Sequence, residues 1–178
     1  MKHDEEYLKS TIRSIPDFPK KGIVFRDITT LLKDPEAMKQ VVDLFYGEYK
    51  DKNISKVVSV ESRGFIFGGA LAYTLGAGFL PIRKKGKLPA ETIQQEYELE
   101  YGTDSMEIHA DAIQPGDRII VHDDLLATGG TIEAACKLVE RLQGEIVGLS
   151  FLIELAFLNG RERIGKYPIQ TLITYDSE

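Results

Sequence analysis

The sequence predicts an α/β protein, with a parallel sheet flanked by helices. Short apolar runs at 56–60, 78–82 and 146–155 have the length and branched side chains of buried strands. Segments with helical periodicity separate them, and this alternation from residue 56 onward is typical of parallel strands joined by right-handed crossovers. With 178 residues, 43% of them hydrophobic, the chain fits one domain spanning residues 1–178.

The first third of the chain is predicted to be mostly helical. Residues 4–14 have the pattern of a short amphipathic helix, and a stretch punctuated by Pro and Gly follows over 15–27. A second helix begins at Asp34, a good N-cap, with Pro35 in its first turn. Its expected apolar face consists of Met38, Val41, Val42, Phe45 and Tyr49.

The middle of the chain contains a strand–turn–helix–strand unit and then a polar insertion. Residues 56–60 form the strand, 61–64 the turn and 65–75 an apolar helix, followed by a strand at 78–82. From 83 to 104 the chain is rich in Lys, Glu, Gln, Tyr and Gly and has little core signal. A long polar insertion in a compact domain is usually functional, so we expect a loop that serves the site.

The last third is expected to contain three strands and one helix. The strands are 117–122, 146–155 and 170–174. The helix after Thr131 is closed by Gly144. Its apolar positions recur at helical spacing and are Ile132, Ala135, Cys136, Val139 and Leu142.

The junction between the 117–122 strand and this helix carries the strongest chemical signal. An acidic turn, Asp123 and Asp124, follows the strand, and Thr128-Gly129-Gly130-Thr131 then opens the helix. Unpaired N–H groups and the helix dipole attract an anion there, and glycine lets the backbone approach it closely. The carboxylates would repel a phosphate, so they are better suited to ribose hydroxyls or a cation. Each piece alone is usually a solvated turn or an ordinary capped loop, but together they indicate a sugar-phosphate site.

A second strand-to-helix turn, Glu61-Ser62-Arg63-Gly64, has the same kind of chemistry. It offers backbone N–H groups, a hydroxyl and a guanidinium that can bind a phosphate with two parallel hydrogen bonds. Both turns follow strands of one predicted parallel sheet, whose ligands bind beyond the carboxyl ends of the strands. The sequence therefore predicts two anion sites on either side of one diol-binding acid pair.

Bulk properties exclude several classes of protein. The net charge of −6 argues against a general nucleic-acid binder, which would be basic. No apolar run approaches the ~20 residues of a membrane span, and the polar start lacks the apolar core of a secretory signal. The single cysteine, Cys136, excludes an intrachain disulfide and is expected to be a packed thiol in a reducing cytosol. We therefore expect a cytoplasmic protein without nucleic-acid or membrane partners.

The stretch from Asp123 to Thr131 resembles the phosphoribosyl pyrophosphate motif of type I phosphoribosyltransferases. Segments 17–27, 61–65, 83–89 and 99–102 are similar to those of family members that use adenine. The resemblance implies the type I fold, with a small N-terminal hood over about 1–33 and a flexible lid loop over about 83–104. It also implies a homodimer and a Mg²⁺ ion that is held mainly through the substrate, without a dedicated set of protein ligands.

The activity that the resemblance implies is transfer of the 5-phosphoribosyl group from phosphoribosyl pyrophosphate to adenine, giving AMP and pyrophosphate in purine salvage. The implied 5′-phosphate and ribose site comprises Asp123 and Asp124, at the 2′ and 3′ hydroxyls, with Ala127, Thr128, Gly129, Gly130 and Thr131. The implied pyrophosphate site comprises Glu61, Ser62, Arg63, Gly64, Lys84 and Lys87. Adenine is expected at Val24, Phe25, Arg26 and Leu155. The implied catalytic residues are Arg63, Glu100, which handles the proton of the purine imidazole, and Tyr101, which helps order the site.

Two alternatives remain open at this point. The enzyme could use another base, such as guanine or hypoxanthine, because adenine specificity rests on the resemblance alone. A non-catalytic binder of the sugar phosphate is a different class, although the chain has no room for an appended DNA-binding domain. His122 occupies a position that is usually aliphatic in the family, and we expect it to be a packing residue and not a catalyst.

Overall fold

A computed structural model describes residues 2–98 and 102–178. In these ranges a mixed sheet has the strand order β5-β6-β4-β3-β7-β8-β9. The strands from β4 to β9 in this order are parallel, as predicted, whereas β6 and β5 add to the β4 edge in antiparallel fashion. The parallel strands are β3 (Lys56–Val60), β4 (Gly78–Lys84), β7 (Arg118–Leu126), β8 (Glu145–Leu155) and β9 (Ile169–Tyr175).

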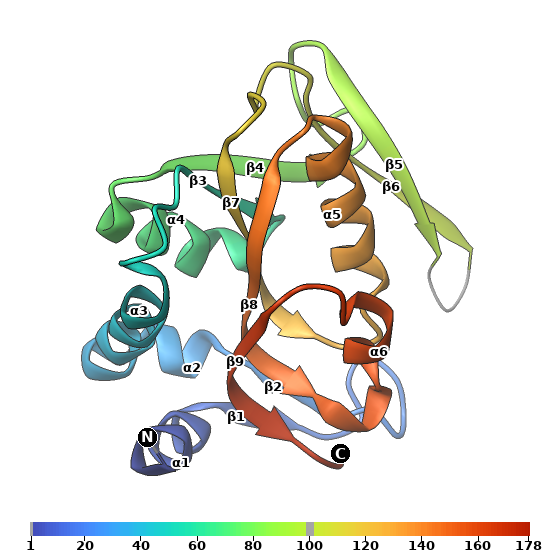
Figure 1. Ribbon diagram of the computed structural model, residues 1–178. Coiled ribbons are helices and arrows are strands. Elements are labelled where there is room, and N and C mark those ends of the chain that lie inside the picture. The colour runs from blue at the N-terminus through green and yellow to red at the C-terminus, as the bar shows by residue number, and fades with distance from the viewer. Residues whose placement is uncertain (1, 99–101) are drawn as a thin grey trace.

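Helices cover both faces of this sheet (Figure 1). On one face, α3 (Pro35–Tyr49) and α4 (Gly64–Leu75) pack against Val57 and Ile120. On the other, α5 (Gly130–Arg141) and α6 (Gly160–Ile164) pack against Val58 and Val121. Neighbouring strand residues thus point into two separate cores, as expected of strands that are buried on both faces. A short 3-10 helix, η1 (Ala156–Leu158), joins β8 to α6.

The predicted start of α3 is confirmed at its cap. The Asp34 carboxylate accepts hydrogen bonds from the backbone N–H groups of Glu36, at 3.0 Å, and Ala37, at 3.2 Å. Such a cap contributes about 1 kcal/mol. The buried face contains Val41, Phe45 and Tyr49 as predicted, together with Ala37, whereas Met38 and Val42 are only partly buried.

The N-terminal segment forms a small layer beside the end of the sheet. It consists of α1 (Lys2–Thr11), β1 (Arg13–Ile15), β2 (Phe25–Asp27) and α2 (Thr29–Leu32). The predicted helix over 4–14 thus ends at Thr11, and the next residues pair with β2 as an antiparallel ribbon. Helix α1 contacts the last strand, since Lys9 Nζ donates to the Thr174 carbonyl in β9 at 2.6 Å (Figure 1).

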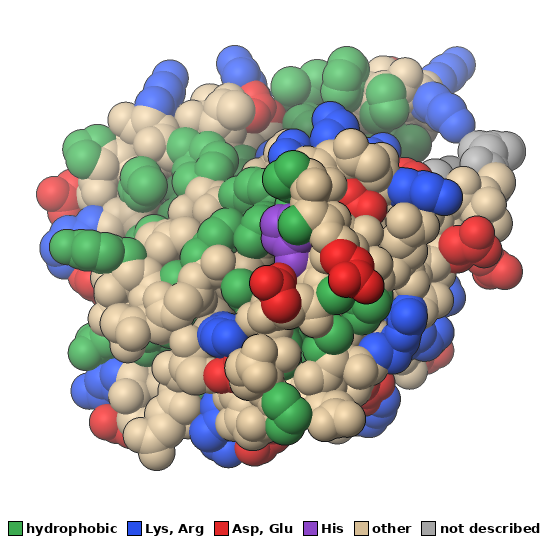
Figure 2. All heavy atoms as spheres, turned by 90° about the horizontal axis from the view of Figure 1, so that it is seen from above, with side chains coloured by type: hydrophobic (Ala, Val, Ile, Leu, Met, Phe, Trp, Pro, Cys, Tyr) green, Lys and Arg blue, Asp and Glu red, His purple; other side chains and the backbone are tan. Residues whose placement is uncertain are grey.

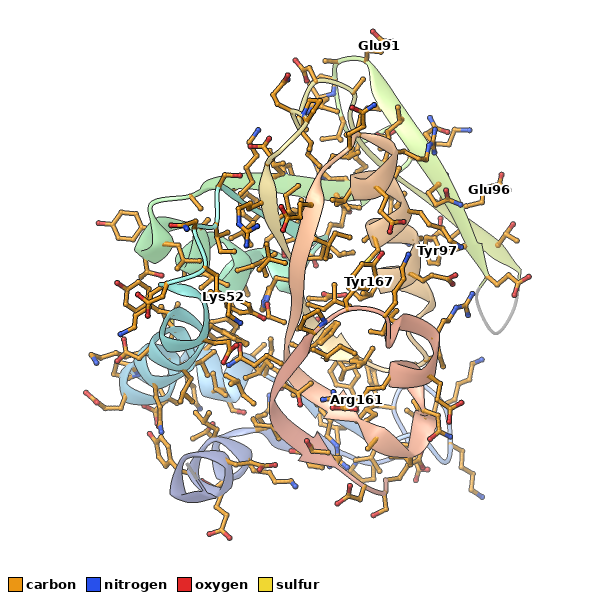
Figure 3. All side chains as sticks on the ribbon, viewed as in Figure 1. Lys52, Glu91, Glu96, Tyr97, Arg161 and Tyr167 are labelled. Atoms are coloured by element: carbon orange, nitrogen blue, oxygen red, sulfur yellow. The ribbon has the colours of Figure 1, made fainter. Side chains whose placement is uncertain are left out.

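The polar insertion differs from its prediction as a loop. Residues 92–98 and 103–104 of it belong to an antiparallel pair of strands, β5 (Thr92–Glu98) and β6 (Thr103–His109), which extends past the sheet beside α5 and is called the hairpin below (Figure 1). Tyr97 points from β5 back toward α5, whereas Glu96 points outward (Figure 3). A hairpin at the edge of a sheet exposes most of its side chains, so its sequence is mostly polar. Only Ile93 and Tyr97 are apolar in β5, and the alternation of apolar and polar residues is therefore too weak to predict a strand.

Strand β7 is longer than predicted, and this moves the acid pair. The prediction ended the strand at His122, but pairing with β8 continues from Asp123 opposite Phe151 to Leu126 opposite Glu154. Asp123 and Asp124 therefore lie in the strand and not in a turn. The reason is tertiary, because the eleven-residue strand β8 continues alongside and pairs with Asp123, Leu125 and Leu126 of β7.

Two bulk features complete the fold. Among residues 2–98 and 102–178, no helix combines the length and apolar content that crossing a membrane requires. On the face seen in Figure 2, basic side chains are scattered among acidic ones and form no continuous basic field.

Candidate active site

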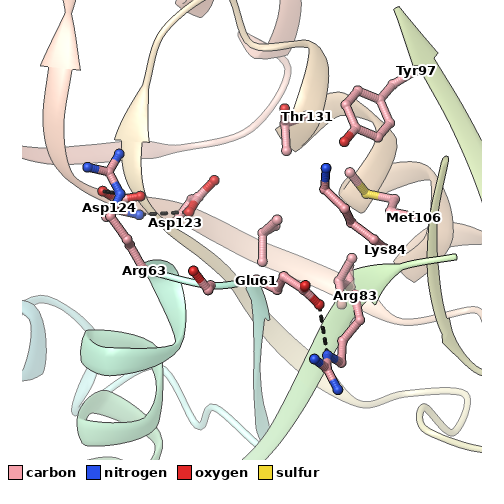
Figure 4. A pocket seen from close by; sticks show the side chains of 12 residues that line it. Glu61, Arg63, Arg83, Lys84, Tyr97, Met106, Asp123, Asp124 and Thr131 are labelled. Atoms are coloured by element: carbon pink, nitrogen blue, oxygen red, sulfur yellow. Dashed lines mark hydrogen bonds and ion pairs between the residues drawn. The ribbon is translucent and has the colours of Figure 1, made fainter. Parts of the chain in front are cut away.

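A cavity of about 410 Å³ opens at the carboxyl ends of β3, β4 and β7 (Figure 4). The predicted residues Glu61, Ser62, Arg63, Lys84, Asp123, Asp124 and Thr131 line it. Val60, Ile82, Arg83, Tyr97 and Met106 complete the lining. The fold thus brings together two turns that are some sixty residues apart in the sequence, as the parallel topology predicts.

A second hollow of about 220 Å³ adjoins the first and is formed by the Thr-Gly-Gly-Thr loop. Its lining runs from Asp123 to Ile132 and includes Arg63. Arg63, Asp123, Asp124 and Thr131 line both hollows. An extended ligand with an anionic group at each end would therefore pass directly over the acid pair.

The phosphate loop takes its shape from glycine at Gly129. Its φ of +82° is a left-handed conformation that other residues rarely adopt, and a Cβ there would come within 2.7 Å of the Gly160 carbonyl oxygen. Helix α5 begins directly afterwards at Gly130, so the N–H groups of its first turn face the smaller hollow. Such N–H groups, with Arg63 on the same hollow, are suited to an anion.

The acid pair is internally linked and tied to Arg63. The backbone N–H of Asp124 donates to Asp123 Oδ1 at 2.9 Å, and Asp124 Oδ2 lies 2.9 Å from Arg63 Nε. Burial and the neighbouring Asp124 charge raise the pKa of Asp123 well above its ordinary value. Burial also raises the pKa of Asp124, although the Arg63 guanidinium opposes the change. Hydroxyl donors or a cation bound beside Asp123 would favour its ionised form.

Arg63 connects the strand ends to the N-terminal segment. Besides its ion pair with Asp124, it donates to the Arg26 carbonyl oxygen at 3.4 Å and lies over the Phe25 ring at 5.2 Å. Phe25 in turn meets Phe18 edge to face at 5.2 Å. One guanidinium thus contacts both the acid pair and the segment predicted to bind the base.

The predicted adenine-binding residues are less clearly arranged for a ligand. The Arg26 guanidinium is buried, donates to Ser14 Oγ at 2.5 Å and stacks on Tyr175 at 3.9 Å, so the side chain is committed to the fold. Val24 is partly buried, and Leu155 is a partly buried residue that packs on the core with α3 and α4. None of these side chains lines the larger cavity.

The turn at 61–64, which is predicted to bind pyrophosphate and is called the pyrophosphate turn below, is held by ion pairs and by close packing. Glu61 Oε2 accepts from Arg83 Nε at 2.8 Å, and Glu61 Oε1 lies 3.8 Å from Lys87 Nζ. A Cβ on Gly64 would lie 2.8 Å from Asp123 Oδ1, so glycine allows this turn to contact the acid pair directly. The Glu61–Ser62 peptide is cis. Lys87 thus approaches the turn through Glu61 and does not line the larger cavity.

Sequence reasoning missed three polar or bulky lining residues. Arg83 is the next-to-last residue of β4 and pairs with Glu61, and Tyr97 and Met106 come from the hairpin. Tyr97 is partly buried, and burial raises its pKa to about 12, so its hydroxyl stays neutral. The alternation of Ile93 with Tyr97 was the one signal that pointed to an inward-facing strand here. The predicted residues Glu100 and Tyr101 lie outside the described residues.

Two buried side chains behave as predicted. His122 is fully buried, its Nδ1 lies 2.8 Å from Ser150 Oγ, and burial lowers its pKa to about 3. Its ring meets Phe45 edge to face, as expected for a packing residue. Cys136 is buried in α5, and burial raises its pKa to about 12, which excludes a reactive thiolate at neutral pH.

Comparison with known proteins agrees with this geometry. The family model "Phosphoribosyl transferase domain" matches residues 27–174. The chain is 60% identical over 168 residues to the adenine phosphoribosyltransferase of Alkaliphilus metalliredigens, covering 94% of this chain and 99% of that protein.

Solved structures agree as well. The adenine phosphoribosyltransferase of Thermoanaerobacter pseudethanolicus matches with a TM-score of 0.92 and 53% identity, covering 96% of this chain and 99% of that one. The Saccharomyces cerevisiae enzyme, solved with an imino-altritol bisphosphate and adenine, matches with a TM-score of 0.92 and 39% identity, covering 97% and 99%. The chain therefore belongs to the phosphoribosyltransferase family and, within it, to the adenine phosphoribosyltransferases.

Proposed function

We propose that the two adjoining hollows are the substrate site for transfer of the 5-phosphoribosyl group from phosphoribosyl pyrophosphate to adenine. The observation that carries the proposal is the shared lining, in which Asp123 and Asp124 lie between the phosphate loop and the pyrophosphate turn. A ribose with a 5-phosphate and a 1-pyrophosphate has anions at both ends and a diol between them. The products are AMP and pyrophosphate.

In this proposal the residues divide between the two ends of the sugar. Backbone N–H groups from Ala127 to Thr131 bind the 5′-phosphate, and Asp123 and Asp124 accept from the ribose hydroxyls. Departure of pyrophosphate leaves positive charge on the ribose and builds negative charge on the leaving oxygens. Arg63 and Lys84, which line the larger cavity, stabilise the negative end. The carboxylates stabilise the positive ribose.

The residues present suit a Mg²⁺ ion that is shared with the substrate. Carboxylate oxygens of Glu61, Asp123 and Asp124 line the larger cavity, and oxygen is the ligand type that Mg²⁺ prefers. Among the described residues, no three His, Cys, Asp or Glu side chains converge as a metal-binding group. We therefore propose that the pyrophosphate supplies most of the ligands. When bound, the ion would neutralise charge on the leaving pyrophosphate.

Base recognition is proposed at the edge of the N-terminal segment. Backbone groups of residues 24–26 would read the adenine edge, with Phe25 and Leu155 against the ring faces. Support comes from Arg63, which connects Phe25 to the acid pair, and from the S. cerevisiae structure, which was solved as a complex with an imino-altritol bisphosphate and adenine. We also propose a homodimer in the cytoplasm, on the grounds of family membership.

The first experiment tests the choice of base. The purified protein is incubated with Mg²⁺, phosphoribosyl pyrophosphate and adenine, guanine or hypoxanthine, and the nucleotides are separated by chromatography. AMP from adenine is the expected product. A nucleotide formed only from guanine or hypoxanthine would overturn the assignment, and binding of the sugar phosphate without any product would favour a non-catalytic binder.

The second experiment tests Glu100, which we propose handles the proton at the purine imidazole. Glu100→Gln should lower kcat much more than it raises the KM for adenine, because the amide keeps the shape of the side chain but cannot take up the proton. Glu98→Gln is a matched control at an exposed position in β5. An unchanged kcat in Glu100→Gln would remove Glu100 from the chemistry.

A further inference from the structure

Each cation that lines the larger cavity is matched with a carboxylate in the described part of the chain. Arg63 pairs with Asp124, and Arg83 pairs with Glu61. Both of these carboxylates also line the cavity. Lys84 is different, because Lys84 Nζ lies 3.1 Å from Oδ2 of Asp104, which does not line it. Asp104 is therefore a carboxylate at the edge of the site to which the proposed reaction gives no role.

Three neighbouring strands present these groups on one side. Tyr97 of β5 lies directly opposite Asp104 of β6, and Met106, two residues further along β6, lies opposite Lys84 of β4. Residues two apart on a strand share a face, so Asp104 and Met106 point the same way. In Figure 4 the Lys84 side chain lies beside Met106, with its amine toward Tyr97 and Thr131. The ammonium group is thus held at the boundary between the hairpin and the substrate cavity.

Asp104 has enough other partners to release this lysine. Its Oδ1 accepts from the Ser105 backbone N–H at 2.8 Å, and its Oδ2 accepts from the Tyr97 hydroxyl at 3.2 Å. The Ser105 N–H, with Lys84, also holds the pKa of Asp104 below its ordinary value, so the carboxyl is ionised at neutral pH. The Lys84 side chain is 62% exposed and has a flexible four-carbon stem. If Lys84 moved to another anion, Asp104 would keep its hydrogen bonds to Ser105 and Tyr97.

We infer that Asp104 is a positioning residue for Lys84, holding its ammonium group beside the pyrophosphate site until the substrate takes it over. Asp104 offers one carboxylate, whereas a pyrophosphate group presents several phosphoryl oxygens at higher charge, so the lysine transfers when the substrate enters. In the free enzyme the ion pair keeps Lys84 near the cavity and balances its positive charge. Because this pair must break before Lys84 can bind the substrate, the pair weakens the net attraction between the lysine and pyrophosphate. The inference rests on the proposed function, which places pyrophosphate in this cavity.

The test is a double-mutant cycle on Asp104→Asn and Lys84→Met, read by titration calorimetry with inorganic pyrophosphate and Mg²⁺. Asp104→Asn keeps the shape of the side chain and frees Lys84, so pyrophosphate should bind roughly two- to fivefold more tightly, the range expected for an exposed ion pair. Lys84→Met should weaken binding. The double variant should bind as Lys84→Met does, because Asp104 acts only through the lysine.

The matched control is Asp111→Asn, which removes the same charge from an exposed turn after β6. It should leave pyrophosphate binding unchanged, whereas equal tightening in this control would show a general charge effect and overturn the inference. Unchanged or weaker binding in Asp104→Asn, or tightening that persists beside Lys84→Met, would overturn it too.

A kinetic readout separates positioning from a structural role. In Asp104→Asn the KM for phosphoribosyl pyrophosphate should fall while kcat does not rise, whereas a loosened hairpin would raise KM. Calorimetry needs no turnover, so absence of AMP formation by the wild-type protein would count against the proposed function and leave the binding cycle interpretable.

Discussion

Replacing Gly129 with alanine separates two costs that the phosphate loop would impose on any side chain. The left-handed conformation at φ +82° costs about 1–2 kcal/mol for a residue with a Cβ. The new Cβ would also lie 2.7 Å from the Gly160 carbonyl oxygen. Overpacking of this kind costs about 1–3 kcal/mol. We therefore expect Gly129→Ala to lower the free energy of unfolding by about 2–5 kcal/mol.

Gly116 provides the matched control, because it has a similar φ of +91° but a Cβ there would meet no atom of a more distant residue within 4 Å. Gly116→Ala should therefore cost only the conformational part, about 1–2 kcal/mol. Equilibrium urea denaturation measures the free energy of unfolding of both variants, and titration calorimetry measures their affinity for AMP. Gly129→Ala should weaken AMP binding and Gly116→Ala should not. Equal destabilisation by the two substitutions would refute the claim that Gly160 crowds this loop.

Three further predictions concern single side chains. Because burial lowers the pKa of His122 from 6.5 to about 3, the unfolded chain takes up a proton below pH 6.5 that the folded chain excludes. The wild-type protein should lose about 2 kcal/mol of stability between pH 7 and pH 5 from this group. Denaturation of His122→Val at both pH values should lack that loss, and an identical pH dependence would contradict it. Asp123→Asn should weaken AMP binding about 10- to 100-fold, since a charge-assisted hydrogen bond contributes about 1.5–3 kcal/mol, and calorimetry showing unchanged affinity would rule out its contact with ribose. The Cys136 thiol should resist a thiol-specific reagent in the native protein and react in denaturant, because burial raises its pKa to about 12.

Elements with strong local signals could be predicted from the sequence. The Asp34 cap with Pro35, the apolar run at 56–60 and the periodic helix after Thr131 each depend on residues close together in the chain. The acid pair and the glycine loop were also found, because their chemistry depends on a short order of residue types at one junction.

What could not be predicted depends on contacts between distant segments. The extension of β7 through Leu126 depends on β8, and the hairpin depends on its place at the β4 edge. For the same reason Arg83 and Tyr97 were missed as lining residues. They line the cavity only because the fold places β4 and β5 near each other at one edge of the sheet.

The close approach of Gly160 to the phosphate loop has a consequence for protein engineering. A Cβ at Gly160 would lie 2.1 Å from the Ala127 carbonyl oxygen, and one at Gly129 would meet the Gly160 carbonyl, so the two segments interlock backbone to backbone. The loop is therefore shaped partly by a glycine about thirty positions downstream. Grafting Asp123–Thr131 alone onto another sheet would transfer the residues without the backbone contact that shapes the loop. A graft that keeps the loop conformation would need the segment around Gly160 as well.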